Sequence, residues 1–522
     1  MTDTHDVIIV GGGPVGMGLA IDLGQRGHSV AVIERHAQPQ LVPKGQNMTQ
    51  RTVEHFDAWG CEPALRAARL QGRDVANGGR MTYRTLLSDH AYDWLPRESV
   101  QPYYGQRVER MPQYRTEAVL RARAAEIPAI DIRYGLSFDG LEQDATGVTV
   151  TASGDGGSHR FRAPHVVGCD GSRSGVREAA GITQTVKEHD RKMVLLVFRS
   201  PELNDLLARH HPPRSFYNAL TPELQGYWRF LGRVDAATEW FHHSPVPADA
   251  TRDNFDFHAL LHETVGQRFE LDLTYTGFWD LRFSLADRYA RGRVLIAGDA
   301  CHSHPPYGGY GINTGFEDAR NLGWKLSARL SGWGGPALLD SYDAERRPVF
   351  ASLSRDFIET FIEEDRAFLA TYSPEKDAAE FTARWNARNE GSGEVFAYEP
   401  NYEGSPLIGG PGQPSARGDH RFAARAGHHL APRALSDGRT TYEALGTGFT
   451  LFDFTGADAG AAFLHASGMA GIPLGVVTDT YDAERRDYDA PLILVRPDGF
   501  VAFAGTSGDA AAVLATATGR TP

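Results

Sequence analysis

The sequence is poor in cysteine, has no long apolar run and carries no excess of positive charge. Its 522 residues include only three cysteines, Cys61, Cys169 and Cys301, which lie far apart and form no CxxC pair. This spacing argues against a disulfide scaffold, a zinc ribbon or a dithiol redox centre. The formal net charge of −13 comes from interspersed acidic and basic residues, which argues against a nucleic-acid-binding surface.

Membrane and export signals are also missing. No segment approaches the roughly 18 consecutive apolar residues of a membrane span. The opening residues, MTDTHDVIIVGGG, lack the basic and apolar regions of a secretory leader. We therefore expect a cytoplasmic protein that binds neither membranes nor nucleic acids. The composition, 41% hydrophobic and 23% charged, is that of a globular enzyme, and the length predicts two or three domains.

A glycine motif near the start of the chain has the context of a dinucleotide-binding fingerprint. Gly11, Gly13 and Gly16 follow an apolar strand at Val7–Val10 and open a helix. The glycines permit a tight turn and close approach of the backbone to a pyrophosphate, whose charge meets the N-terminus of the helix. Glu34 ends the next apolar strand, where an acid can bind the ribose hydroxyls of adenosine. The fingerprint alone does not distinguish FAD from NAD.

Two later motifs favour FAD. In VVGCDGSRSGVR, Asp170 and Gly171 follow a buried strand. In RVLIAGDACHSHPPYGGYGINTGFEDARNLGWKL, Asp299 ends a strand, where its carboxylate is able to accept hydrogen bonds from ribityl hydroxyls. The prolines and glycines that follow predict a stiff loop that lies flat against a planar ligand. A helix is expected to begin near Ile312–Asn313, and its free amides would stabilise negative charge on the pyrimidine end of a reduced flavin.

These three motifs, in this order, resemble those of the FAD-dependent aromatic hydroxylases, the single-component class A flavoprotein monooxygenases. The motifs cover roughly residues 5–185 and 280–350. The resemblance implies noncovalently bound FAD, reduction by NADPH or NADH, and a flavin C4a-hydroperoxide that transfers one oxygen atom from O2 to an activated aromatic ring. Because the chain has a single fingerprint, the nicotinamide is expected to bind only transiently.

The expected fold class is α/β, with a Rossmann-like FAD-binding domain interleaved with a β-sheet substrate domain, and a thioredoxin-like domain at the C-terminus. The FAD-binding domain is expected within residues 1–400, in segments of about 1–80, 106–185 and 285–400, and the substrate domain at about 81–105 and 186–284. The stretch NYEGSPLIGGPGQPSARGDH marks the boundary to residues 401–522. This last part resembles the tail of the phenol-hydroxylase branch, which lacks a redox CxxC, so we expect a structural or dimer-forming role.

The resemblance also implies which residues contact the cofactor. These are Gly11, Gly13, Pro14, Gly16, Glu34, Arg35, Lys44, Gln113, Asp170, Asp299, Pro306, Gly309, Gly311, Ile312 and Asn313. Lys44 stands where many family members have arginine, and a lysine meets a phosphate as a point charge rather than as a fork. Asp170 corresponds to an aspartate that the family links to both FAD and NAD(P)H.

The residues of the oxygen chemistry are less clearly marked. A phenolic substrate reacts faster once deprotonated, so a base or hydrogen-bond acceptor is expected near its ring. The catalytic candidates are His304 in the flavin loop, Tyr217 in the pocket sheet and Arg51 at the start of a helix. Gln46 falls where some family members have a catalytic acid, a role that glutamine cannot take. No metal site is expected, because the adjacent histidine pairs of the chain point apart on most backbones and lack a completing carboxylate.

We therefore expect an FAD- and NAD(P)H-dependent monooxygenase that forms a homodimer or higher homo-oligomer. Its substrate is expected to be a phenol, a hydroxylated heteroaromatic or a larger polyketide-type aromatic, in catabolism or natural-product tailoring. A flavin halogenase is disfavoured because the chain lacks that group's WxWxIP stretch. An oxidase or reductase of the same fold, and a protein that uses FAD structurally and its tail for assembly, are the remaining alternatives.

Overall fold

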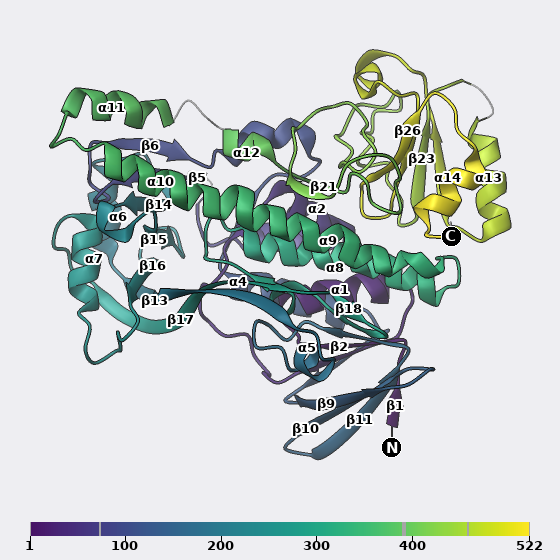
Figure 1. The fold of residues 1–522 in the computed structure, drawn as a ribbon, viewed down its shortest axis with the longest axis horizontal. Coiled ribbons are helices and arrows are strands. Elements are labelled where there is room, and N and C mark those ends of the chain that lie inside the picture. The colour runs from purple at the N-terminus through teal and green to yellow at the C-terminus, as the bar shows by residue number, and fades with distance from the viewer. Residues whose placement is uncertain (1, 73–74, 389–392, 457–458, 521–522) are drawn as a thin grey trace.

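A six-stranded, mostly parallel sheet lies at the centre of the molecule (Figure 1). The computed structural model describes residues 2–72, 75–388, 393–456 and 459–520. The sheet has the strand order β18-β19-β12-β2-β3-β8, and only β18 runs antiparallel to its neighbour. Its strands are β2 (Val7–Val10), β3 (Val30–Glu34), β8 (Ile130–Tyr134), β12 (His165–Gly168), β18 (Ala290–Arg291) and β19 (Val294–Ile296).

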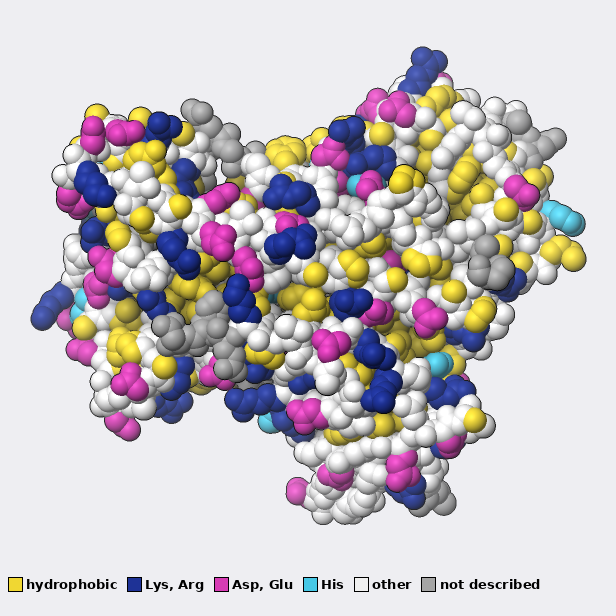
Figure 2. Space-filling view, in the orientation of Figure 1, with side chains coloured by type: hydrophobic (Ala, Val, Ile, Leu, Met, Phe, Trp, Pro, Cys, Tyr) yellow, Lys and Arg dark blue, Asp and Glu magenta, His cyan; other side chains and the backbone are white. Residues whose placement is uncertain are grey.

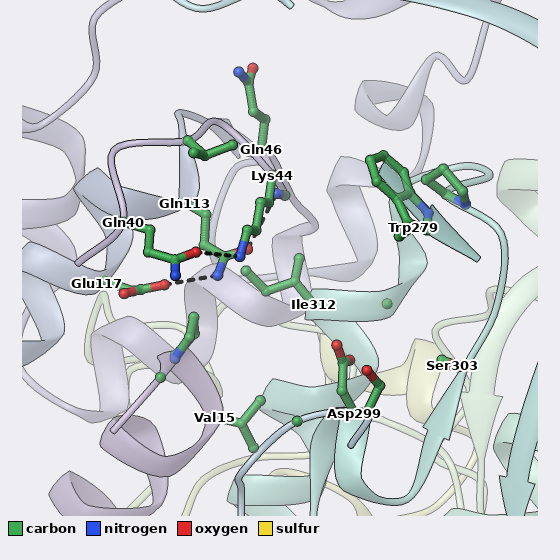
Figure 3. Close-up of a pocket in the computed structure, with 18 of the residues that line it drawn as sticks. Val15, Gln40, Lys44, Gln46, Gln113, Glu117, Trp279, Asp299, Ser303 and Ile312 are labelled. Carbon is green, nitrogen blue, oxygen red and sulfur yellow. Dashed lines mark hydrogen bonds between the residues drawn. The ribbon is translucent and has the colours of Figure 1, made fainter. Parts of the chain in front are cut away.

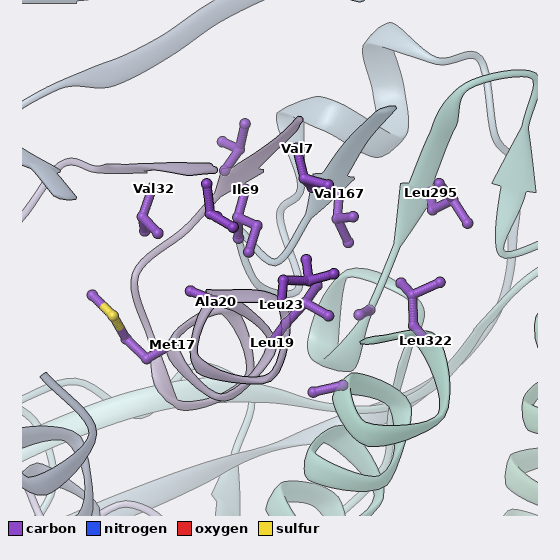
Figure 4. Close-up of a cluster of buried hydrophobic side chains, with 14 of the residues drawn as sticks. Val7, Ile9, Met17, Leu19, Ala20, Leu23, Val32, Val167, Leu295 and Leu322 are labelled. Atoms are coloured by element: carbon purple, nitrogen blue, oxygen red, sulfur yellow. The ribbon is translucent and has the colours of Figure 1, made fainter. Parts of the chain in front are cut away.

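Three helices, α1 (Pro14–Gln25), α4 (Gln113–Ala125) and α8 (Tyr310–Leu330), pack against this sheet and each other. Figure 4 shows apolar side chains of β2, β3, β12 and β19 meeting those of α1 and of Leu322 on α8. The strands read as continuous apolar runs because the parallel sheet is buried on both faces. A second sheet, ordered β1-β11-β10-β9, adjoins this core. Its strands are Thr2–Thr4, Gly157–Ala163, Val148–Gly154 and Ser137–Gln143.

An eight-stranded sheet forms the other large part of the fold, in the order β20-β17-β13-β16-β15-β14-β5-β6. Its strands are β5 (Ala76–Tyr83), β6 (Ala91–Trp94), β13 (Gln184–Arg199), β14 (Arg214–Leu220), β15 (Trp228–Arg233), β16 (Glu239–Pro247), β17 (Asp272–Ala286) and β20 (His302–Ser303). Helices α6 (Pro201–Ala208) and α7 (Phe257–Val265) cover one face. Because successive side chains of a strand point to opposite faces, the central strands turn alternate residues toward these helices, among them Leu196, Tyr217 and Trp240.

The C-terminal part forms a four-stranded sheet of its own, in the order β24-β23-β25-β26. Strands β23 (Phe449–Asp453) and β24 (Leu474–Thr478) are parallel and joined by α13 (Ala459–Ala470). An antiparallel hairpin of β25 (Leu492–Val495) and β26 (Val501–Gly505) follows, and then α14 (Ala510–Ala517). This β-α-β unit with an appended hairpin and helix is the expected thioredoxin-like arrangement.

A buried ion cluster joins the C-terminal sheet to the centre of the molecule. The Glu345 carboxylate, on α9 (Asp340–Leu353), accepts hydrogen bonds from Lys325 Nζ of α8 at 2.6 Å and from Arg496 Nη1 and Nη2 at 2.6 and 2.9 Å. Asp498 pairs with the same arginine at 2.6 Å. Although burial alone would raise it, the charges of Arg496 and Lys325 hold the pKa of Glu345 well below its usual range. Two acids and two bases therefore neutralise one another in direct contact.

Several element boundaries differ from the expectation. Helix α8 begins at Tyr310, two residues early, because Gly309 adopts a left-handed conformation (φ 69°) and caps it. Asp299 lies in a 3-10 turn at Gly298–Ala300, beyond the end of β19, because Gly298 (φ 63°) turns the chain. The segment between β3 and the eight-stranded sheet contains the short strand β4 (Asn47–Met48) and two helices, α2 (Gln50–Ala58) and α3 (Glu62–Ala67).

Acidic and basic side chains are interspersed over the face of the molecule displayed in Figure 2. None of the helices in the described ranges is both long enough and apolar enough to cross a membrane. Cys61, Cys169 and Cys301 are all free thiols.

Replacing Glu345 by glutamine should destabilise the protein strongly. The variant leaves Lys325 and Arg496 buried with only one acid between them, and breaking a buried pair in this way costs about 3–5 kcal/mol. Urea or thermal unfolding measures the loss. The matched control is Glu380→Gln, since that carboxylate meets Arg384 at 3.8 Å on the surface, where an ion pair is worth about 0–1 kcal/mol. Equal unfolding midpoints for the two variants would contradict this account.

Candidate functional site

One cavity of about 990 Å³ runs from the glycine turn after β2 to the inner face of the eight-stranded sheet. Of the residues expected to contact a cofactor, the cavity is lined by Gly11, Gly13, Pro14, Glu34, Arg35, Lys44, Gln113, Asp170, Asp299, Pro306, Gly309, Gly311 and Ile312. Figure 3 shows side chains from distant parts of the sequence, among them Val15, Gln113, Asp299 and Ile312, around this space. The cavity thus brings the three sequence motifs together.

The glycine turn packs closely on its surroundings and leaves one position open. A Cβ atom at Gly11 (φ 107°) would lie 2.3 Å from the carbonyl oxygen of Cys169, and one at Gly16 would lie 2.0 Å from that of Gly11. A Cβ at Gly13 would meet nothing within 4 Å. Gly11 and Gly16 therefore allow the turn, α1 and the end of β12 to approach, whereas Gly13 presents open backbone to the cavity beside the N-terminus of α1.

The acid at the end of β3 is held in place by backbone amides. Glu34 accepts hydrogen bonds from the N–H of Gly12 at 2.7 Å and from the N–H of His36 at 2.6 Å. A carboxylate has more acceptor positions than these two bonds use. Glu34 is therefore oriented and still able to bind hydroxyl groups in the cavity.

Polar side chains surround the middle of the cavity. Gln113 Nε2 donates to Glu117 at 2.8 Å, and its Oε1 accepts from the N–H of Gly45 at 3.3 Å. Lys44 Nζ donates to Gln40 Oε1 at 2.9 Å (Figure 3). Among the described residues, the Asp299 carboxylate has no hydrogen-bond donor. It is exposed to the cavity but enclosed by protein, and this enclosure raises its pKa against the opposing charges of His302 and Lys44.

The first turn of α8 faces the cavity with its backbone. Gly311 and Ile312 line the space, and the N–H groups of a first helical turn have no partner within the helix. Asn313 turns away instead. Its side chain accepts from the N–H of Thr49 at 2.9 Å and donates to the carbonyl of Asn47 at 2.9 Å. Asn313 thus ties α8 to the segment that precedes α2.

Asp170 lies at the edge of the cavity, where it organises the short helix α5 (Gly175–Ala179). Its carboxylate accepts from Ser174 Oγ at 2.5 Å and from the N–H of Val176 at 3.1 Å. Burial raises the pKa of Asp170, and these hydrogen bonds oppose the rise.

Aromatic rings form a continuous wall at the far end of the cavity. Phe216 of β14 stacks on Phe230 of β15 with ring centroids 5.4 Å apart, and Phe230 lies 5.5 Å from Phe241 of β16. Trp94 of β6 packs edge-on to Phe216 at 5.7 Å. With Trp279 of β17, these residues line the cavity and offer stacking surfaces to a planar ligand.

Four polar side chains that line the cavity each keep at least one buried atom without a hydrogen-bond partner among the described residues. Their unpaired atoms are the Gln46 amide oxygen and nitrogen, Arg110 Nε, His243 Nδ1 and His304 Nε2. Buried polar groups in native proteins are nearly always hydrogen-bonded. Unpaired groups that line a cavity are therefore candidates for hydrogen bonds to a ligand.

His304 has a defined tautomer. Its Nδ1 lies 2.5 Å from the carbonyl oxygen of Pro305, which only accepts, so Nδ1 carries the proton and Nε2 is an acceptor. Burial lowers the pKa of His304 to about 4, and the ring is neutral at physiological pH. Its neighbour His302 holds the loop, since its Nε2 meets Asp318 at 2.8 Å and its ring stacks on Phe350.

The other two catalytic candidates lie outside the cavity. Tyr217 follows Phe216 on β14, so its ring points to the opposite face, and its hydroxyl accepts from the N–H of Arg214 at 3.1 Å. Arg51 donates to both oxygens of Glu317, at 3.0 and 3.2 Å, and contacts the carbonyl of Asp498. It thereby links α2, α8 and the C-terminal sheet.

Sequence reasoning missed Arg110, His243 and the aromatic wall. The alternation of side chains along β16, which places Phe241 and His243 on one face and Trp240 on the other, was the available signal. In the described part of the chain, no group of three or more His, Cys, Asp or Glu side chains is arranged to hold a metal ion.

Residues 4–356 match the family described as "FAD binding domain", and residues 423–521 match "Aromatic-ring hydroxylase, C-terminal". The chain is 34% identical over 366 residues to a 12-dehydrotetracycline 5-monooxygenase/anhydrotetracycline 6-monooxygenase of Streptomyces rimosus, covering 67% of this chain and 68% of that protein. It is 31% identical over 551 residues to a putative polyketide hydroxylase of Streptomyces halstedii, covering 95% and 92%.

The fold also matches solved structures. The structure of the rebeccamycin biosynthetic enzyme RebC with reduced flavin is similar over 99% of this chain and 100% of that one, with a TM-score of 0.83 and 27% sequence identity.

The protein should begin to lose stability at pH values well above the pKa values of its buried histidines. Burial lowers the pKa of His242 and His243 to about 3 and that of His304 to about 4. Between about pH 6.5 and pH 4 the unfolded chain binds protons that the folded chain does not. The free energy of unfolding should therefore fall as pH falls, by up to about 1.4 kcal/mol per pH unit for each histidine.

Urea unfolding across this pH range measures the slope. The variant His243→Asn should show a shallower slope, and His258→Asn, at an exposed position of α7, should keep that of the parent protein. A parent whose unfolding free energy is constant from pH 7 to pH 5 would show that these rings are not held neutral.

Proposed function

Because this chain belongs to the FAD-dependent aromatic-ring hydroxylases, we propose that it hydroxylates a phenolic or hydroxylated heteroaromatic ring with NADPH or NADH and O2. A single observation carries the proposal: one continuous cavity joins the glycine fingerprint to a wall of aromatic rings. The cavity offers space for a dinucleotide at one end and a planar substrate at the other.

The residues present fit FAD. The open backbone of Gly13 and the N-terminus of α1 would meet the pyrophosphate, and Glu34 would bind the adenosine ribose. The unpartnered carboxylate of Asp299 would accept from ribityl hydroxyls, and the N–H groups at Gly311 and Ile312 would face the pyrimidine ring. Contacts of the same cofactor are proposed for Pro14, Arg35, Lys44, Gln113, Asp170, Pro306 and Gly309, which line the cavity around these groups.

FAD, when bound, would supply the redox chemistry, in which NADPH or NADH provides two electrons, one oxygen atom of O2 enters the ring and the other leaves as water. The protein supplies binding and orientation. The rings of Phe216, Phe230 and Trp279 would stack on the substrate and exclude water from it. The first turn of α8 would stabilise negative charge that develops at the pyrimidine end of the cofactor.

His304 is the group proposed to accept a hydrogen bond from the hydroxyl of the substrate. Its Nε2 is an acceptor, it has no partner in the described structure, and it lies 3.6 Å from the point where a Cβ atom of Gly311 would stand, at the start of α8. A hydrogen bond from the substrate hydroxyl to Nε2 would increase the electron density of the ring and favour attack on an electrophilic oxygen. Gln46 would orient the substrate through its free amide.

Alanine substitution should have different effects at Gly11, where it should lower stability, and at Gly13, where it should weaken FAD binding. In Gly11→Ala the new Cβ collides with the Cys169 carbonyl and the residue keeps a left-handed conformation, so the thermal midpoint of the FAD-free protein should fall by several degrees. Gly13→Ala should leave that midpoint unchanged, because nothing stands near its Cβ, but weaken FAD binding at least tenfold. Calorimetric titration with FAD would detect this, and undiminished FAD affinity in Gly13→Ala would place the pyrophosphate elsewhere.

Mixing the FAD-loaded protein in air with NADPH or NADH and a panel of phenols, hydroxypyridines and polyphenolic aromatics tests the proposed function. We expect stimulated nucleotide consumption and a product heavier by one oxygen atom, which is labelled when ¹⁸O2 is supplied. The variant His304→Asn should still consume nucleotide but release hydrogen peroxide, with the hydroxylation rate reduced about 100-fold or more. His258→Asn is the control. Consumption without any oxygenated product for every aromatic would favour an oxidase or reductase of this fold.

A further inference from the structure

Arg110 is a buried cation that has no acidic partner. It lies on β7 (Glu109–Arg110), which pairs with β4, and its side chain lines the aromatic end of the cavity. The residue is only 3% exposed. Within the described residues its guanidinium forms no ion pair, and its Nε has no hydrogen-bond acceptor. The guanidinium carbon stands 4.5 Å from the centroid of the Phe216 ring, which holds the group at the aromatic wall.

The charged groups around Arg110 do not neutralise the positive charge of its guanidinium. The adjacent acid, Glu109, is committed to Arg66 at 3.2 Å and to Arg69 at 2.7 Å. Burial, together with the positive charges of Arg97 and Arg69, lowers the pKa of Arg110 to about 9. Arg97 also lines the cavity, and it donates to the carbonyl of Gly308 at 2.5 Å. Asp280, an acid of β17 on the same cavity, is exposed and forms no ion pair with Arg110.

A buried charge without a counter-charge is unfavourable, and proteins keep such groups where a ligand completes the pair. The planar fork of a guanidinium matches two oxygens that share a negative charge. Arg110 is stacked on Phe216 in the aromatic wall, far along the cavity from the glycine turn. The missing anion therefore belongs at the substrate end.

We propose that the enzyme acts on anionic aromatic substrates, and that Arg110 binds the carboxylate or ionised ring hydroxyl that carries the charge. This proposal rests on the hydroxylase function above and specifies its substrate class. Stacking on the aromatic wall would hold the ring of the substrate, and the ion pair would set which edge of that ring faces His304.

Calorimetric titration of the oxidised holoenzyme tests the proposal without turnover. The ligands are two matched pairs: 3-hydroxy-2-naphthoate with its methyl ester, and 2-naphthol with 2-methoxynaphthalene. The parent enzyme should bind the naphthoate at least tenfold more tightly than the ester. Arg110→Gln should lose this preference and leave ester binding unchanged, and Arg110→Lys should retain part of it. Arg268→Gln, at an exposed position outside the cavity lining, should behave as the parent.

The second ligand pair distinguishes the two possible sources of the charge. If the ring hydroxyl is the anion, 2-naphthol should bind more tightly as pH rises through its ionisation, while 2-methoxynaphthalene should not. If the carboxylate is the anion, only the naphthoate pair should respond to Arg110→Gln. Either response supports an oxyanion bound by Arg110. If the enzyme binds the two members of each pair equally tightly, the proposal is overturned.

Stability provides an independent readout. Since Arg110 is an uncompensated buried charge, Arg110→Gln should raise the thermal midpoint of the ligand-free protein, whereas loss of a structural residue would lower it. A variant that loses FAD would show that the anion is a cofactor phosphate and would overturn the proposal. The absence of oxygenated product, combined with carboxylate-selective binding, would overturn the hydroxylase function alone.

Discussion

The close approach of three backbone segments is the constraint on which the site depends. The turn after β2, the first turn of α1 and the end of β12 meet at distances that leave no room for a Cβ atom at Gly11 or Gly16. This contact sets the position of the α1 N-terminus relative to β3, and therefore relative to Glu34. It also brings the cavity to the carboxyl ends of parallel strands, where ligands of open α/β sheets bind.

The two ends of the cavity follow different physical rules. The glycine end is polar and most of its side chains are already hydrogen-bonded, so it is organised before a ligand arrives. Elsewhere around the cavity, Gln46, Arg110, His243 and His304 have buried polar atoms without a partner among the described residues, although leaving such atoms unpaired is costly. Unpaired polar groups of this kind are expected at functional sites, where they reduce local stability but are available to bind a ligand.

The glycine end of the cavity could be predicted because its motifs are local and end on one parallel sheet. Gly13 and Glu34 belong to one strand–turn–helix–strand unit, and Asp299 follows β19 of the same sheet, so all three line one cavity. The aromatic end could not be predicted in the same way. Its residues come from separate strands of the eight-stranded sheet, and a shift of one residue sends a side chain to the other face. Tyr217 and its neighbour Phe216 illustrate this, because Phe216 lines the cavity and Tyr217 lies on the opposite face. The side chains of Arg51 and Asn313 form hydrogen bonds with Glu317 and Thr49. Arg51 and Glu317, like Asn313 and Thr49, are distant in the sequence, so no local motif indicates these pairings.

Helix α8 connects the site to the C-terminal sheet through one continuous element. Its first turn lines the cavity, its middle packs against the central sheet through Leu322, and Trp324 enters the core of the C-terminal part. The indole nitrogen of Trp324 donates to Asp498 at 3.0 Å beside the buried ion cluster. A chimera that takes its C-terminal part from a relative would therefore also need that relative's residues at the positions of α8 and α9 that contact this part. The boundary between the central and C-terminal parts of the fold therefore runs through α8 and α9 rather than through the chain segment that joins the two parts.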